Sequence, residues 1–199
     1  SSIFKLMDNN LIIVAFYSYL LGSIPFGLIL TKLFLQKDIR ELGSGNIGTT
    51  NVLRTGNKFL AASTLIFDLL KGYLSVYITL SFFESLVSYS ALICFIGHIF
   101  PVWLKFKGGK GVATYLGIIL ALSYKFFIIF GVSWIILSLL FRFASLSSII
   151  STLIIFLYAY FLENNTFSLI LFIFFIVILY THKENIVRLK NAKENKIKL

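Results

Sequence analysis

Seven apolar stretches constrain this chain more than any other feature, because several of them are long enough to cross a lipid bilayer. They cover approximately residues 9–35, 59–83, 85–104, 112–124, 126–141, 143–162 and 166–181. A membrane-spanning helix needs about 20 mainly apolar residues. Only 13% of the 199 residues are charged, whereas a soluble domain carries about 25%. The sequence therefore predicts an all-α integral membrane protein and excludes both a water-soluble fold and a disordered chain.

The region 112–141 decides how many helices are expected. As one helix it would be about 45 Å long, which exceeds a hydrocarbon core of about 30 Å. Splitting it near Lys125 keeps most of the 18 basic residues on the cytoplasmic side, as the positive-inside rule requires. We therefore expect seven transmembrane helices, with the N-terminus outside and the C-terminus cytoplasmic. They form one transmembrane domain over 1–199, in which 190–199 are a basic cytoplasmic tail.

Three clusters of glycine and polar residues fall on the predicted cytoplasmic side. The first, 43–54, combines many hydrogen-bond donors with apolar Ile47 and Val52, which favours a folded loop over a solvated linker. It ends in Arg54, a candidate cation for an anionic ligand. Further candidates for substrate binding in this loop are Gly43, Gly45, Asn46, Thr50 and Asn51.

The second cluster surrounds Lys110 with Gly108, Gly109 and Gly111, and Lys107 precedes it. Consecutive glycines let successive backbone N–H groups point into one concavity, a nest suited to an anion. The start of the following helix adds its positive dipole end. The cluster is not a Walker A loop, because Gly111 follows the lysine. Taken alone, a flexible basic turn explains it equally well.

The third cluster follows the last apolar stretch. His182, Asn185 and Arg188 recur every three residues and therefore share one side of a continuing helix. A helix end that snorkels at the membrane interface is the commoner explanation for such residues. Together, however, Arg54, Lys110 and Arg188 predict a polyanionic ligand, most simply the phosphate of a substrate that is part lipid.

Two features inside the apolar stretches indicate structure more than chemistry. Asp68 and Lys71 lie three residues apart and are expected to pair, since an unpaired charge in the membrane is costly. Contact between Asp68 and substrate stays open. The single cysteine, Cys94, excludes a disulfide and a thiolate metal site. Because acidic residues are few and His98 and His182 are far apart in sequence, neither a metal nor a cofactor is predicted.

Six motifs, in their order and spacing, resemble the bacterial acyl-phosphate-dependent glycerol-3-phosphate acyltransferases of phospholipid synthesis. They lie at 22–27, 43–54, 68–72, 97–101, 107–114 and 182–189. The sequence departs from the family at Thr49, where alanine is usual, and at Ala192, where glycine is usual. Neither change removes a charged or catalytic-type residue.

The resemblance implies a seven-helix enzyme of the bacterial inner (plasma) membrane whose active site faces the cytoplasm. Such an enzyme transfers a fatty acyl group from acyl phosphate to the 1-hydroxyl of sn-glycerol 3-phosphate, giving lysophosphatidic acid and phosphate. Its expected partners are these two substrates and membrane lipid, without nucleic acid or an obligate protein partner. The family's functional positions match Ser44, Arg54, Lys110, His182 and Asn185, and its phosphate loop matches Gly108, Gly109 and Gly111.

The chemistry of the donor limits what the protein must supply. Acyl phosphate is already activated, because phosphate is a good leaving group, so no covalent acyl-enzyme is expected. Each substrate phosphate carries about −1.5 to −2 near pH 7, and Arg54 and Lys110 are the first candidates to offset that charge. Ser44 is expected to donate a hydrogen bond to phosphate or to the developing oxyanion.

The group that removes the proton from the attacking hydroxyl is left open between two candidates. One is His182, whose ordinary pKa is near 6.5, and the other is a phosphate oxygen of the acyl donor, whose second pKa is near 6. We favour the substrate phosphate, with His182 and Asn185 positioning glycerol phosphate.

A phosphate or organophosphate transporter is the alternative function. Such transporters place cations and broken helices near the midplane of the membrane and usually contain internal repeats. Here the basic and glycine-rich clusters fall at one face, and no repeat is evident. Catalysis is therefore favoured over transport.

Overall fold

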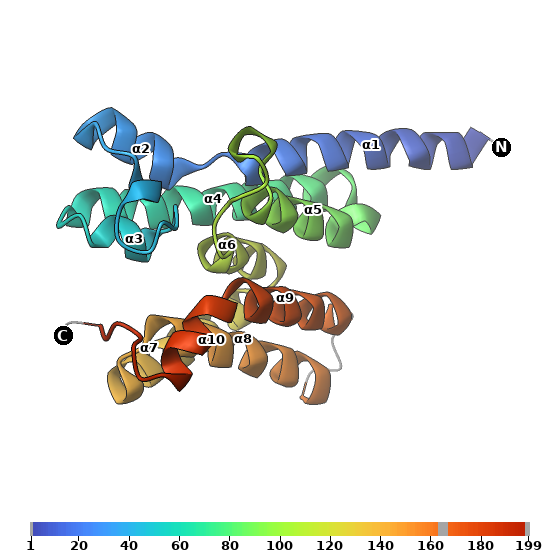
Figure 1. Ribbon diagram of the computed structural model, residues 1–199. Helices are drawn as coiled ribbons and strands as arrows, with labels where there is room; N and C mark the ends of the chain where they lie inside the picture. Colours follow the sequence, from blue (N-terminus) through green and yellow to red (C-terminus); the bar gives the residue numbers. More distant parts are fainter. Residues whose placement is uncertain (1, 163–166, 198–199) are drawn as a thin grey trace. The chain divides into compact units, whose positions relative to one another are not determined.

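The computed structural model describes residues 2–162 and 167–197, and every regular element in this part of the chain is a helix (Figure 1). The chain divides into two compact units, Ser1–Ala121 and Leu122–Leu199. The described elements of the first unit are α1 (Ser2–Ser23), α2 (Phe26–Leu35), η1 (Ile39–Glu41), α3 (Thr49–Leu53), α4 (Lys58–Phe82), η2 (Glu84–Leu86), α5 (Val87–Ile99), η3 (Val102–Leu104) and α6 (Val112–Leu122). Those of the second are α7 (Tyr124–Phe141), α8 (Ala144–Phe161), α9 (Ser168–Thr181) and α10 (Lys183–Lys190).

The predicted membrane class is confirmed by the length and composition of these helices. Among the described residues, five segments are long and apolar enough to cross a membrane: Asn9–Leu35, Lys58–Phe82, Glu84–Leu104, Tyr124–Phe141 and Ala144–Phe161. The pair α9 and α10 passes the same criterion but is bent by 59° at His182. It is either a broken span or a re-entrant segment.

Residues 112–141 form two helices, as predicted, but the break lies at Ser123 and not at Lys125. The backbone of Ser123 is extended, with φ −164° and ψ 121°, and α7 begins directly after it. The helix before the break, α6, has 11 residues and is about 16 Å long. It is therefore shorter than a hydrocarbon core of about 30 Å.

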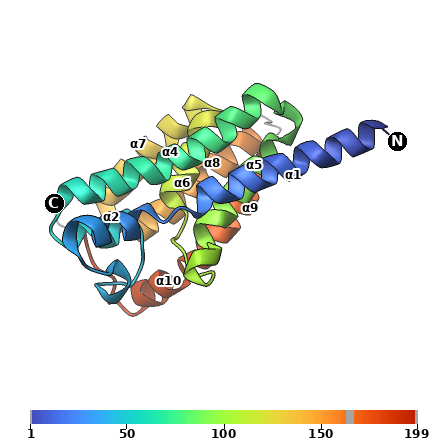
Figure 2. The same ribbon diagram turned by 90° about the horizontal axis from the view of Figure 1, so that it is seen from above.

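Close helix packing in the first unit depends on glycines. Helices α1 and α5 lie side by side (Figure 2). A Cβ at Gly22 would overlap the backbone of Cys94, and one at Gly97 would come within 2.7 Å of the Tyr19 carbonyl oxygen. Small residues let helix backbones approach in a membrane, where lipid offers no hydrophobic force to hold helices together.

A break between α1 and α2 is held by side chains from other helices. Pro25 has no N–H and cannot continue the helix, so α1 ends at Ser23 and α2 begins at Phe26. The indole N–H of Trp103 donates to the Ser23 carbonyl oxygen at 2.8 Å. The Lys71 ammonium donates to the Ile24 carbonyl oxygen at 2.7 Å. The backbone groups released by the break are thus satisfied inside the protein.

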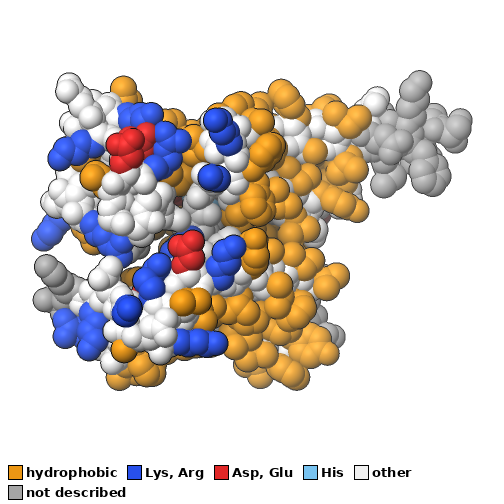
Figure 3. Space-filling model, in the orientation of Figure 1, with side chains coloured by type: hydrophobic (Ala, Val, Ile, Leu, Met, Phe, Trp, Pro, Cys, Tyr) orange, Lys and Arg blue, Asp and Glu red, His pale blue; other side chains and the backbone are white. Residues whose placement is uncertain are grey.

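The second unit packs α8 against both α7 and α9. Helix α8 buries several hydroxyl groups, and most of them bond within the protein. Ser147 donates to the Phe143 carbonyl oxygen at 2.9 Å, and Trp134 Nε1 donates to Ser148 Oγ at 3.0 Å. In each unit the lysine and arginine side chains gather at one end, and hydrophobic side chains cover the remainder of the visible face (Figure 3). This distribution agrees with the charge asymmetry expected of a membrane protein.

Candidate active site

The first polar cluster, 43–54, is a folded loop, as predicted. It rests on a small apolar core in which Ile39 and Val52 are fully buried and Ile47 and Leu60 are 3% and 2% exposed. The loop is further held by Gly27 of α2, where a Cβ would overlap the Ile47 carbonyl oxygen. These apolar anchors fix a segment that is otherwise rich in glycine and hydroxyl groups.

Asn51 shapes the loop from inside. Its Nδ2 group lies 2.9–3.0 Å from the carbonyl oxygens of Ile39, Leu42 and Asn46 and donates to them. Its Oδ1 atom accepts from the Ser44 backbone N–H at 3.0 Å. The residue is 2% exposed, so both ends of its amide are used within the loop. The structure gives Asn51 a bracing role, where the sequence had indicated a substrate ligand.

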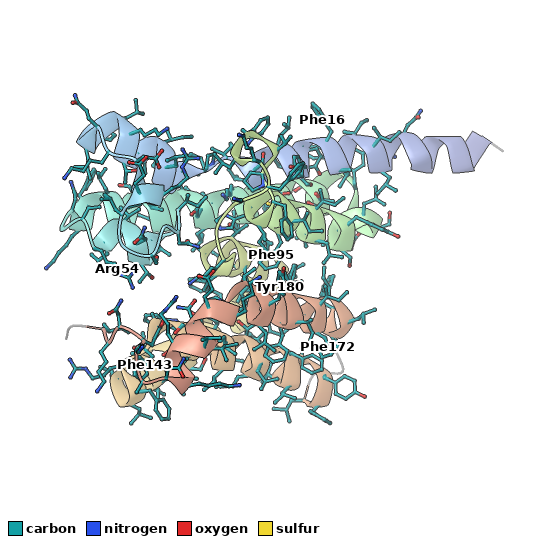
Figure 4. All side chains as sticks on the ribbon, in the orientation of Figure 1. Phe16, Arg54, Phe95, Phe143, Phe172 and Tyr180 are labelled. Carbon is teal, nitrogen blue, oxygen red and sulfur yellow. The ribbon has the colours of Figure 1, made fainter. Side chains whose placement is uncertain are left out.

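Ser44 and Arg54 are presented at the surface of this braced loop. Both residues are exposed, and Arg54 leaves the end of α3 (Figure 4). A Cβ at Gly43, whose φ is +55°, would meet Asn51 Oδ1 and approach the Arg54 side chain. Glycine is therefore required at 43 for both conformation and space. The same loop places Thr50 at the surface, while Asn46 Oδ1 accepts from the Gly48 N–H at 2.8 Å.

A salt-bridged aspartate fixes the chain where it enters this loop. Asp38 accepts from the Arg40 side chain at 2.6 and 2.9 Å and from the Arg40 backbone N–H at 3.0 Å. Lys32 lies 3.4 Å from the same carboxylate. The hydrogen bonds from Arg40 hold the pKa of Asp38 well below its usual range, so this carboxylate stays charged at neutral pH.

The prediction that the backbone N–H groups of Gly108 and Gly109 form an anion-binding nest is wrong. The Gly108 N–H donates to the Ile99 carbonyl oxygen at 2.9 Å, and the Gly109 N–H donates to the His98 carbonyl oxygen at 3.1 Å. These amides satisfy carbonyl groups at the end of α5, which would otherwise lack helical partners. They therefore do not point into a concavity for an anion.

Close packing explains the glycines of this segment instead. A Cβ at Gly109 would overlap the His98 ring, and a Cβ at Gly111, whose φ is +90°, would overlap the Phe95 ring. Lys110 lies between these two glycines and is half-buried, whereas Lys107 is exposed. The segment 108–111, called the glycine loop below, is thus pressed onto α5, and it fixes the backbone from which the Lys110 side chain leaves.

His182 lies in the second unit, at the bend between α9 and α10, and is 4% exposed. Its Nδ1 atom is 2.8 Å from the Ile178 carbonyl oxygen. A carbonyl oxygen only accepts, so Nδ1 carries the hydrogen in this contact. In the neutral ring the lone pair is then on Nε2, which can accept a hydrogen bond from a hydroxyl group.

Asn185 and Arg188 share one face of α10, as the spacing predicted, and both contact a residue that the sequence analysis missed. Asn185 Nδ2 donates to Glu194 Oε1 at 2.6 Å, and Arg188 Nε donates to Glu194 Oε2 at 2.7 Å. Ser145 of α8 also donates to Glu194 Oε1, at 2.8 Å. The predicted basic tail therefore contains one acidic residue, Glu194, that contacts α8 and α10. The one feature of the sequence that could have drawn attention to Glu194 is that it is an acidic residue within a strongly basic segment.

The stability of this contact is expected to depend on pH. Burial alone would raise the pKa of Glu194, but the hydrogen bonds from Asn185, Arg188 and Ser145 outweigh it and hold the pKa below its usual value. The carboxylate therefore stabilises the fold fully above a pH of about 4.3, and this contribution is lost as the pH falls further. We expect Glu194→Gln to lower the free energy of unfolding by about 2 kcal/mol at pH 7.

Thermal unfolding in detergent across pH 3–7 tests this expectation. The difference between the parent chain and Glu194→Gln should shrink as the pH falls through the acidic range. Glu184→Gln is the matched control, because Glu184 lies 3.8 Å from Arg188 but its side chain is 76% exposed, and exposed pairs contribute little. A pH-independent difference for Glu194→Gln would contradict the assignment.

The comparison with known proteins identifies the family. The sequence matches the family model for glycerol-3-phosphate acyltransferase over residues 12–192. The chain belongs to the glycerol-3-phosphate acyltransferase family. One relative of that name, from Pelagibacter ubique, is 50% identical over 188 residues, which cover 94% of this chain and 98% of the relative. Another, from Mesorhizobium japonicum, is 46% identical over 191 residues, which cover 96% of this chain and 98% of the relative.

Solved structures from the glycerol-3-phosphate acyltransferase family share this fold. The crystal structure of PlsY, an integral membrane glycerol 3-phosphate acyltransferase, in its glycerol 3-phosphate form has a TM-score of 0.90 and 34% sequence identity. The match covers 95% of this chain and 96% of PlsY. The lysophosphatidic acid form of PlsY has a TM-score of 0.87 and 33% sequence identity, and the match covers 94% of this chain and 95% of PlsY. The resemblance inferred from the sequence motifs is thereby confirmed.

The candidate residues of this acyltransferase family member fall in both units. The first unit contains the 43–54 loop, with Ser44 and Arg54, and the glycine loop with Lys110. The second contains His182, Asn185 and Arg188 on a continuous bent segment. Within the described residues, no group of three or more histidine, cysteine, aspartate or glutamate side chains could hold a metal ion.

Proposed function

We propose that this chain transfers a fatty acyl group from acyl phosphate to the 1-hydroxyl of sn-glycerol 3-phosphate. The products are lysophosphatidic acid and inorganic phosphate, and the reaction is the first acylation of phospholipid biosynthesis. The observation that carries the proposal is the match over 95% of the chain to the glycerol 3-phosphate form of PlsY. Nothing in the comparisons favours a phosphate or organophosphate transporter.

Two cations are proposed to bind the substrate phosphates. Arg54 stands on a loop that Asn51 fixes from inside, so its guanidinium is suited to clamp a phosphate with two parallel hydrogen bonds. Lys110 leaves a backbone held on α5 by the two glycines beside it and supplies a point charge to the donor phosphate. The exposed Ser44 hydroxyl, on the same loop as Arg54, donates to phosphate or to the oxyanion that develops on the acyl carbonyl.

His182 and Asn185 are proposed to bind glycerol 3-phosphate, with Arg188 adding positive charge. The contact of His182 Nδ1 with the Ile178 carbonyl oxygen fixes the ring, and a hydrogen bond between this ring and a glycerol hydroxyl is proposed. Asn185 and Arg188 are held in place by Glu194. Other polar groups proposed to line the substrate are Gly43, Gly45, Thr50, Lys107 and Gly111.

The reaction itself needs only one displacement. The 1-hydroxyl oxygen attacks the acyl carbonyl carbon, the bond from that carbon to the phosphate oxygen breaks, and the hydroxyl proton moves to the departing phosphate. We favour the donor phosphate as the base because its second pKa is near 6 and because it leaves with the proton it accepts. No covalent acyl-enzyme and no cofactor enter this scheme.

The topology proposed for this enzyme has seven helices in one domain, an outer N-terminus and a cytoplasmic C-terminus. In this topology most of the basic residues of the sequence fall on the cytoplasmic side, as the positive-inside rule requires. The active site opens to the cytoplasmic side of the bacterial inner membrane, where soluble glycerol 3-phosphate enters. The acyl donor and the product remain in contact with lipid.

Purified protein in detergent tests the proposed activity directly. Phosphate release that requires both acyl phosphate and glycerol 3-phosphate, with formation of lysophosphatidic acid, is the expected result. Acyl-CoA and acyl-carrier protein are expected to fail as donors. Turnover with either thioester donor, or uptake of organophosphate into vesicles without acyl transfer, would overturn the proposal.

A further inference from the structure

A buried charged cluster lies beside the glycine loop in the first unit. Asp68, Lys71 and His98 are 2%, 3% and 4% exposed, and all three lie in apolar helices, where ionisable residues are costly and usually functional. The expected pair is confirmed, because Lys71 Nζ lies 2.8 Å from Asp68 Oδ1. The same ammonium donates to the Ile24 carbonyl oxygen, so the cluster also reaches the break between α1 and α2.

His98 connects this ion pair to the glycine loop. Its Nδ1 atom is 3.8 Å from Asp68 Oδ1, while its Nε2 edge lies against Gly109 so closely that a Cβ there would overlap the ring. The His98 carbonyl oxygen accepts from the Gly109 N–H at 3.1 Å. One residue therefore holds Gly109 through both its ring and its backbone.

The glycine loop has two contacts with the end of α5, and Lys110 lies between them. Phe95 (labelled in Figure 4) contacts Gly111, and His98 contacts Gly109. Residues three apart on a helix share one face, so the two rings form a single platform under the loop. The position of the Lys110 Cα atom thus depends on both rings.

Pairing of charges alone does not account for the cluster. His98 Nδ1 is buried without a hydrogen-bond partner among the described residues, and such groups in native structures call for an explanation. A core that needed only to be filled would be as stable, or more so, with apolar side chains of similar volume. The retained polarity indicates a role in holding the neighbouring loop.

We propose that Asp68, Lys71 and His98 are positioning residues that fix the glycine loop and thereby set the location of the Lys110 ammonium. Asp68 and Lys71 hold the His98 ring, and the ring supports Gly109. None of the three is proposed to touch substrate. The inference rests on the proposed role of Lys110 in binding the donor phosphate.

Kinetics of His98→Gln test the proposal. We expect the KM for acyl phosphate to rise about tenfold, since displacement of a binding group by a fraction of an ångström is costly, while the KM for glycerol 3-phosphate changes much less. A second variant, Asp68→Asn with Lys71→Met, removes both charges together and leaves no lone buried ion. It should shift the donor KM in the same direction.

Two further measurements separate positioning from folding. In a Lys110→Ala background, His98→Gln should cause no additional rise in the donor KM, because residues that act through one group are not additive. Ser90→Ala is the matched control on α5, since Ser90 bonds to Ser18 and Ser75 at 2.9 Å within the same helix bundle. It should lower thermal stability without changing either KM.

The outcomes distinguish this inference from the proposed function. If Lys110→Ala raises the donor KM but folded His98→Gln and the double variant leave it unchanged, the positioning role is overturned and the role of Lys110 stands. If Lys110→Ala itself leaves the donor KM unchanged, both fail together. A fall in kcat with unchanged KM in the cluster variants would show a structural role only and would also overturn the inference.

Discussion

Lys110→Ala is expected to lower kcat/KM for acyl phosphate by about 100-fold or more, as removal of one preorganised electrostatic group commonly does. The reason is local. Lys110 leaves a backbone that the contacts of Gly109 and Gly111 fix on α5, so its ammonium is a preorganised group in the proposed site. Initial rates of phosphate release at varied acyl phosphate, with glycerol 3-phosphate saturating, measure the effect.

The control for Lys110 comes from the same segment. Lys105 is exposed and has a φ of 51°, and Lys105→Asn removes a positive charge while keeping a residue that tolerates this conformation. It should leave kcat/KM for the donor within a factor of about two, as surface charges contribute little. Equal losses in both variants would mean that Lys110 acts only through the general positive field of the site.

His182→Gln has the second largest expected effect, and it tests which group is the base. If the donor phosphate takes the proton, the variant loses one hydrogen bond to glycerol 3-phosphate, and its KM should rise about ten- to a hundredfold. The kcat at saturating substrate should fall much less. Retained glycerol phosphate affinity with abolished turnover would instead make His182 the base.

The pH profile gives an independent reading of the same question. A histidine base would produce an acidic limb in kcat that disappears in His182→Gln. With the phosphate as base, the limb should persist in the variant. The contact from Nδ1 to the Ile178 carbonyl oxygen should hold the ring orientation in the parent enzyme throughout this titration.

The sequence predicted the helices well because long apolar stretches leave the backbone few alternatives in lipid. The break within 112–141 was also predicted, yet it fell at Ser123, where an extended residue and not a charge separates the helices. The motifs indicated the family correctly. They did so through their order and spacing along almost the whole chain.

The parts of the site that were not predicted depend on directions that a linear pattern does not contain. The glycines of the second cluster suggested an anion nest, but the end of α5 supplies carbonyl groups that accept from the N–H groups of Gly108 and Gly109. Glu194 was missed for a similar reason. Its partners Asn185, Arg188 and Ser145 lie 6–49 residues away in sequence, and a lone acidic residue in a basic tail does not indicate which residues it contacts.

The shortness of α6 bears on how a lipid-like donor reaches the reacting groups. Thinning a bilayer to match a helix of about 16 Å would deform it by roughly half its thickness, at a cost that grows with every ångström of mismatch. If α6 is a span of the proposed topology, placing the glycine loop at hydrocarbon depth would avoid that deformation. Non-helical backbone is tolerated at such depth only where protein satisfies it, and the carbonyl groups of His98 and Ile99 do so for Gly108 and Gly109. In the proposed reaction, the acyl chain would then stay within its leaflet while the carbonyl carbon beside the phosphate is attacked.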